Sequence, residues 1–122
     1  MSFIPFAQRQ SVRRLLLAGV ALHAVPVAAQ SVSISTATTT PIATATASNG
    51  APADISITNT GSVIVPSGTA VTLNSNNSIT NAGTITSQGT SDSTGLRIDA
   101  ATNPTGSITN NGTINVTTSG TT

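Results

Sequence analysis

The phrase SITNTGSV at residues 56–63 returns, with small changes, as SITNAGTI at 78–85 and as SITNNGTI at 107–114. The shared pattern is S-I-T-N-x-G-[ST]-[IV], and its asparagines lie 22 and then 29 residues apart. A phrase that repeats every 20 to 30 residues or so is typical of a solenoid, in which each coil buries its apolar residues against the next. The phrase therefore predicts an all-β, parallel β-solenoid of about three coils.

Each copy of the phrase places Asn and Gly between two aliphatic residues. Asn and Gly tolerate positive φ, so they predict a corner between two short strands. Strands of successive coils would lie about 4.8 Å apart, which places equivalent side chains in rows. The row expected at the corner, with its side-chain amides forming a ladder, is Asn59, Asn81 and Asn110. The row expected in the core is Ile57, Ile79 and Ile108.

Strand-like alternation also precedes the second and third copies, at AVTLN in 70–74 and GLRID in 95–99. Val71 and Leu73 should align with Leu96 and Ile98. The third repeat carries four extra residues near NPTG at 103–106, which predicts an enlarged loop at one corner, where solenoids accept insertions. The candidate core is aliphatic throughout: Ile55, Ile57, Val63, Val65, Val71, Leu73, Ile79, Ile85, Leu96, Ile98, Ile108, Ile114 and Val116. The strand edges after Val116 are expected to be open.

Charged residues make up only 6% of the 122 residues, against roughly a quarter in ordinary domains. Beyond residue 29 the ionisable side chains are Arg97 and the aspartates Asp54, Asp92 and Asp99, a net charge of 1 − 3 = −2. No basic patch exists to displace the counterions of a nucleic acid, so we expect no nucleic-acid partner. Without large aromatic residues a compact globular core would be thin, whereas the narrow interior of a solenoid needs none.

The first 29 residues have the features of a secretory signal peptide. Arginines at 9, 13 and 14 precede the apolar run LLLAGVAL at 15–22, and VAA at 27–29 provides small residues for cleavage before Gln30. The apolar run is shorter than the roughly 20 residues that a membrane-spanning helix needs. We therefore expect residues 1–29 to direct export and to be removed.

The remainder divides into three parts by composition. Residues 30–54 are rich in Thr, Ala and Ser, and they predict either a disordered linker or an N-terminal cap that protects the first strand. SVSI at 31–34 alternates as a first strand would. Residues 55–116 contain the solenoid repeats, and 117–122 form an incomplete end of the repeat region.

The residues needed for catalysis are scarce. No His or Cys follows residue 29, so no serine has a base to activate it. Asp92 and Asp99 are the nearest pair of carboxylates, and the glycine-aspartate nonapeptides of calcium-binding β-rolls are absent. Asp54 and Asp99 sit where Asp is usual in turns. Arg97 is expected to face solvent on the same strand face as Asp99. The sequence predicts no catalytic, cofactor-binding or metal-binding residue, no cofactor, and no enzyme.

The signal peptide followed by S-I-T-N-x-G-[ST]-[IV] repeats resembles the start of a bacterial autotransporter passenger, from type V secretion. This resemblance covers residues 1 to about 116. It implies a right-handed parallel β-helix, export across the envelope of a Gram-negative bacterium and a C-terminal outer-membrane β-barrel. The barrel is missing from this chain, which has no aromatic residue after Phe6 and hence no aromatic girdle. The resemblance therefore implies either an N-terminal fragment or a truncated gene.

The function expected from these features is that of a secreted or cell-surface structural or adhesive segment. Its partners would be downstream β-solenoid coils, the absent outer-membrane barrel, and a surface glycan or other cell-surface ligand. Three alternatives remain. One is the N-terminal part of a polysaccharide-active β-helix enzyme, and another is a haemagglutinin-like exoprotein secreted through a separate partner barrel. The third is a disordered, Thr- and Ser-rich secreted segment.

Overall fold

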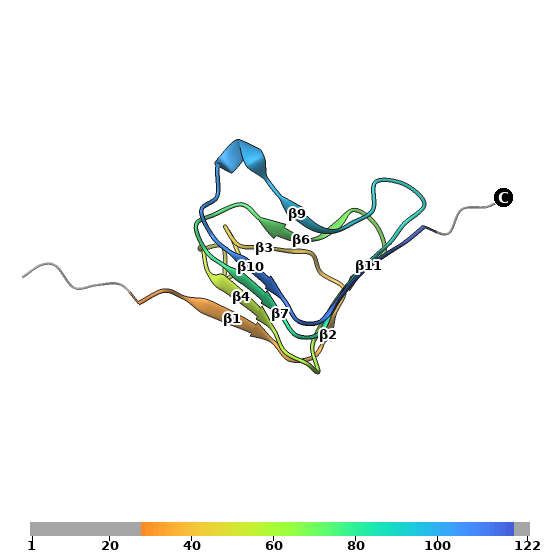
Figure 1. The fold of residues 1–122 in the computed structure, drawn as a ribbon, viewed down its shortest axis with the longest axis horizontal. Coiled ribbons are helices and arrows are strands. Elements are labelled where there is room, and N and C mark those ends of the chain that lie inside the picture. Colours follow the sequence, from red (N-terminus) through yellow and green to blue (C-terminus); the bar gives the residue numbers. More distant parts are fainter. Residues whose placement is uncertain (1–27, 119–122) are drawn as a thin grey trace, which may run out of the picture.

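The computed structural model describes residues 28–118 as a β-solenoid with three sides (Figure 1). The signal peptide predicted over residues 1–29 falls almost wholly outside the described residues, as do residues 119–122. The first side contains β1 (Ser31–Ile34), β4 (Asp54–Ile57), β7 (Ile79–Asn81) and β10 (Ile108–Asn110). The second contains β2 (Ala37–Thr38), β5 (Ser62–Val65), β8 (Thr84–Gln88) and β11 (Thr113–Thr117). The third contains β3 (Ile42–Ala43), β6 (Thr69–Leu73) and β9 (Thr94–Ile98).

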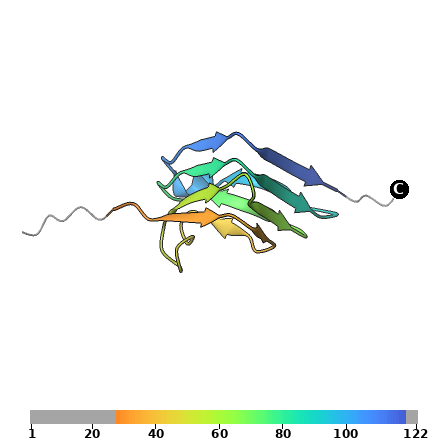
Figure 2. The same cartoon turned by 90° about the horizontal axis from the view of Figure 1, so that it is seen from below.

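Neighbouring strands within each sheet are parallel, and each strand pairs with its equivalent in the next coil. Seen from the side, the coils lie one above another from the N-terminal to the C-terminal end (Figure 2). The described residues thus make three coils of three strands and two strands of a fourth. The parallel β-solenoid of about three coils is confirmed.

The core is a narrow aliphatic column because alternate residues of every strand point inward. One row runs through all four coils on the first side, with Ile55 paired to Val32 below it and Ile79 paired to Ile108 above it. Eight of the predicted core residues are buried: Ile55, Ile57, Val63, Val65, Val71, Leu73, Ile79 and Ile85. The predicted alignment of Val71 with Leu96 and of Leu73 with Ile98 is also confirmed.

The predicted asparagine and isoleucine rows are each wrong in one member. Ile55, not Ile57, pairs with Ile79, and Ile57 pairs with Asn81. The cause is the corner of the second coil. Eight residues separate Ile55 from Val63, whereas six separate the equivalent positions in the third coil. The two additional residues form a wider corner on which Asn59 is exposed to solvent.

The asparagine ladder therefore has two members, and both belong to the first-side sheet. The Asn81 side chain is fully buried, and its Nδ2 donates to Asn110 Oδ1 at 2.8 Å and to the Thr113 carbonyl at 3.3 Å. Asn81 Oδ1 accepts from the Gly83 backbone N–H at 3.1 Å. The inward row that begins with Ile34 and Ile57 thus becomes polar at Asn81, with every polar atom of that side chain hydrogen-bonded.

Replacement of Asn81 by Ala should lower the free energy of unfolding by about 1–3 kcal/mol, because the buried Gly83 N–H loses its acceptor. Asn59 occupies the same place in the repeated phrase but is exposed, so Asn59→Ala should change stability by less than about 0.5 kcal/mol. Urea unfolding of both variants measures the difference. Equal losses would show that the amide of Asn81 has no special role.

The glycines of the phrase are required for close stacking, not for positive φ as predicted. Among the described residues, the glycines with positive φ are Gly50 and Gly68, which lie outside the phrase. A Cβ on Gly83 would overlap the carbonyl oxygens of Gly61 and Thr58, and a Cβ on Gly112 would overlap the Gly83 carbonyl oxygen. The corner of one coil rests directly on the backbone of the previous corner, and only glycine leaves room for it.

The solenoid starts at Ser31, before the predicted boundary at residue 55. The first strand expected at 31–34 is confirmed as β1, and residues 37–38 and 42–43 form β2 and β3 of the same coil. After β3 the chain makes a turn closed by an antiparallel bridge between Ser48 and Ala51. Thr44 is buried beside it, where its hydroxyl accepts from the Asn74 backbone N–H at 3.0 Å.

The enlarged corner of the third repeat is confirmed. After β9 the chain forms a short 3₁₀ turn, η1 (Ala100–Thr102), which ends at Asn103 in the left-handed region with φ of 45°. Asn76, on the corresponding corner of the previous coil, accepts a hydrogen bond from the Thr105 backbone N–H at 3.2 Å. The insertion therefore leaves the register of the next strands unchanged.

Candidate functional site

The four ionisable side chains beyond residue 29 do not gather in one place. Asp54 begins β4 and supports the next coil, because its Oδ1 accepts from the Ser78 N–H at 2.8 Å and from Asn77 Nδ2 at 3.2 Å. Asp92 lies exposed in the loop between β8 and β9 with φ of 54°. Asp54 thus serves the stacking of the coils, and Asp92 is isolated on a loop.

Arg97 and Asp99 form the expected neighbouring pair at the end of β9. Their closest nitrogen and oxygen atoms are 3.8 Å apart, and the Arg97 side chain is 60% exposed. An exposed ion pair of this kind adds little stability. Asp99 also accepts from the Ala101 N–H and so begins the η1 turn. Within residues 28–118 the structure contains no group of three His, Cys, Asp or Glu side chains that could hold a metal ion. No helix among these residues is long and apolar enough to cross a membrane.

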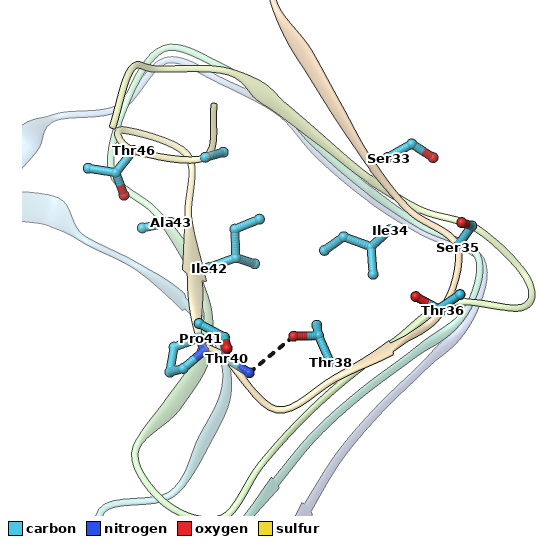
Figure 3. Close-up of a pocket in the computed structure, with 11 residues that line it drawn as sticks. Ser33, Ile34, Ser35, Thr36, Thr38, Thr40, Pro41, Ile42, Ala43 and Thr46 are labelled. Carbon is cyan, nitrogen blue, oxygen red and sulfur yellow. Dashed lines mark hydrogen bonds between the residues drawn. The ribbon is translucent and has the colours of Figure 1, made fainter. Parts of the chain in front are cut away.

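The N-terminal end of the solenoid is hollow. A cavity of about 420 Å³ opens inside the first coil, lined by residues between Ser33 and Ala47 (Figure 3). Ile34 and Ile42 point toward each other across it, and Thr38 closes its third side (Figure 3). The lining consists of aliphatic and hydroxyl side chains without charge. The cavity is the interior of a coil that no described strand covers from the N-terminal side.

The C-terminal end of the described solenoid is an open edge. β10 pairs with β7 alone and β11 with β8 alone among the described strands, so their outer backbone N–H and C=O groups are unpaired within the structure. Ile114 and Val116 of β11 are 40% and 45% exposed, and Ile98 on β9 is 58% exposed. The prediction that these three residues are core is therefore wrong in the described structure, because no described strand lies above them. Leu96 and Ile108 are partly buried against the core.

Sequence reasoning predicted one of these two ends. The open edge at β11 follows from the position of the last copy of the phrase. The cavity was missed because β2 and β3 are two residues long and carry little of the aliphatic pattern seen later. The signal that could have identified it is the spacing from Val32 to Thr38, which is six residues and equals the spacing from Ile79 to Ile85.

Comparisons with models of protein families, with curated proteins and with solved structures find no match for this chain. The class of the protein therefore follows from its geometry. It is a parallel β-solenoid with polar outer faces and with two unpaired ends in the described part of the chain. The ends, not a catalytic cleft, are the places where the described surface offers unsatisfied backbone groups and exposed aliphatic side chains.

Proposed function

We propose that this chain is a structural or adhesive segment of an exported β-solenoid, similar to the passenger of a bacterial autotransporter. The observation that carries the proposal is the unbroken parallel stack over residues 31–117, which places repeated polar rows on its outside. On the first side one such row contains Ser33, Ser56, Thr80 and Thr109. Hydroxyl groups repeated about 4.8 Å apart present regular hydrogen-bond donors and acceptors to a polar surface such as a glycan.

In this proposal the solenoid is right-handed, since parallel strands joined through crossovers in one sheet almost always have that hand. Further coils of the same kind extend the stack beyond β11, and an outer-membrane β-barrel carries the passenger to the surface of a Gram-negative cell. A passenger of this kind acts by extension and contact and needs no catalytic residues. A polysaccharide-active enzyme would need two carboxylates that face one substrate, whereas Asp54 and Asp99 hold corners of the solenoid.

Export is the first test of the proposal. The chain expressed in a Gram-negative host should be recovered outside the cytoplasm with Gln30 as its first residue, because the apolar run at 15–22 and the small residues at 27–29 meet the requirements of signal cleavage. Replacement of Leu16 by Arg interrupts the apolar run and should retain most of the chain in the cytoplasm.

Thr80→Arg is the matched control, since it adds the same charge on the exposed face of β7. N-terminal sequencing and cell fractionation provide the readout. An exported chain that still begins at Met1, or export of Leu16→Arg at the normal level, would contradict the proposal.

A further inference from the structure

The two ends of the described solenoid are complementary in backbone geometry. A parallel sheet that ends at β10 and β11 accepts only strands that run in the same direction and alternate inward and outward in the same register. The strands β1 and β2 at the other end of the molecule run in that direction around the same axis (Figure 1). A second copy, displaced along the axis without rotation to another face, therefore presents the kind of strands that the open edge accepts.

The corner lengths at the two ends also agree. Between the inward residues Val32 of β1 and Thr38 of β2 there is a spacing of six residues. The spacing from Ile108 of β10 to Ile114 of β11 is also six. The second coil, with eight residues over the same corner, fits with a bulge. Coil one of a second copy thus matches the last described corner more closely than the second coil matches its own neighbours.

The side-chain contacts required by such stacking already occur within the chain. The new inward pairs would be Val32 on Ile108, Ile34 on Asn110 and Thr38 on Ile114. Their counterparts inside one molecule are Val32 beside Ile55, Ile57 beside Asn81 and Thr38 beside Val63. Every new pair therefore has the size and polarity of a pair that the solenoid already tolerates in its core or at its first coil.

No charge protects either end. The strands β10 and β11 read ITN and TINVT, and the strands β1, β2 and β3 read SVSI, AT and IA. Solenoids and sheets that remain monomeric commonly place Lys, Pro or an irregular segment at such edges. The third side differs from the other two, because β9 is its last described strand and a second copy on β11 would leave one strand spacing open there. Ile98 therefore lies outside the direct contact.

We propose that copies of this chain associate head to tail, with β10 and β11 of one copy pairing with β1 and β2 of the next. The second copy takes the place that a further coil would take, and Ile114 closes the cavity beneath Thr38. Because the contact relates copies by translation along the axis, it does not close on itself and it produces linear chains. The proposal depends on the two ends only, so it stands or falls separately from export.

The test uses the whole chain produced in an exporting host, with the N-terminus of the purified species determined first. Sedimentation velocity over a wide range of protein concentrations should show oligomers that lengthen as concentration rises. Ile114→Lys places a charge at the C-terminal contact, and Thr38→Lys places one in the N-terminal cavity. Each variant alone should sediment as a monomer, with the circular dichroism of the wild type. An equimolar mixture of the two should form dimers and nothing longer, since each variant keeps one intact end.

Two controls separate the contact from general effects of charge. Asn115→Lys alters the residue next to Ile114 on the same strand but on its outward face, so it should assemble as the wild type does. Ile98→Lys charges the exposed aliphatic residue of the third side and should also assemble. A monomeric wild-type chain at all concentrations would overturn the proposal. So would assembly that Ile114→Lys abolishes and Thr38→Lys leaves intact, which would indicate pairing between two C-terminal edges.

Discussion

Replacement of Ile79 by Asp is expected to abolish the β-sheet signal of the whole chain. Ile79 is fully buried in the third coil, between Ile55 and Ile108 in the inward row. An ionised carboxylate without a partner costs several kcal/mol when it is buried, and the loss of the isoleucine side chain removes a further 2–5 kcal/mol or so. The sum is comparable to the roughly 5–15 kcal/mol that separates a typical native domain from its unfolded state.

Thr80→Asp is the matched control for this prediction. Thr80 is the next residue of β7, and its side chain is exposed on the outer face of the sheet. The same carboxylate placed there should leave the circular dichroism spectrum and the urea midpoint almost unchanged. If both variants kept the wild-type spectrum, position 79 would not be inside a packed core, and the inward row would be wrong.

Gly83→Ala is the second substitution with a large expected effect. The added methyl group would overlap the carbonyl oxygens of Gly61 and Thr58, which are backbone atoms and cannot rotate away. Relief requires the third coil to move away from the second, which lengthens the hydrogen bonds on both sides of the corner. We expect the free energy of unfolding to fall by about 3 kcal/mol, at the upper end of the usual cost of overpacking.

Gly50→Ala separates this steric effect from the general cost of removing a glycine. Gly50 has φ of +88° and no atom near the position of an added Cβ, so its replacement meets strain of the backbone alone. That strain should cost about 1 kcal/mol. Urea unfolding of both variants provides the comparison. A loss at Gly83 no larger than the loss at Gly50 would mean that the coils are not in contact at this corner.

The class of fold could be predicted because the repeated phrase combines two independent signals. Alternation identifies strands such as β6 and β9, and their similarity at a fixed spacing implies that they stack in parallel. The pairing of Val71 with Leu96 and of Leu73 with Ile98 was predictable for that reason. Little else about the third side depended on distant contacts.

The register of the first side could not be predicted from the phrase. Identical letters suggested that Ile57 aligns with Ile79, but burial decides register, and a shift of two residues keeps the same side chains inside. Ile55 and Ile57 are both inward and both isoleucine, so the sequence is compatible with either alignment. The structure places the two additional residues on the exposed corner at Asn59, where they disturb no core contact.

The two ends of the solenoid could be predicted only in part. The aliphatic character of Ile114 and Val116 indicated core positions, and burial of these residues depends on a strand that lies above them. Coil one was missed for the opposite reason, because hydroxyl residues such as Thr38 occupy inward positions where the first coil is open to solvent. Pattern alone cannot distinguish an inward threonine at an open end from a threonine in a loop.

The central claim is that successive coils stack in parallel in the register described, and cysteine crosslinking tests it most directly. The chain contains no cysteine, so introduced pairs are unambiguous. Ser56 and Thr80 are register partners on the outer face, about 4.8 Å apart, which suits a disulfide. The double replacement Ser56→Cys and Thr80→Cys should crosslink fully under mild oxidation without loss of structure.

The pair Thr58→Cys and Thr80→Cys joins the two threonines that occupy the same place in the repeated phrase. In the described register they are offset by two residues along the strand, beyond the roughly 7 Å that a disulfide can bridge. Mass spectrometry of the oxidised monomer should therefore find the crosslink in the first pair and not in the second. A crosslink in the second pair alone would contradict the register, and the absence of both would contradict the parallel solenoid.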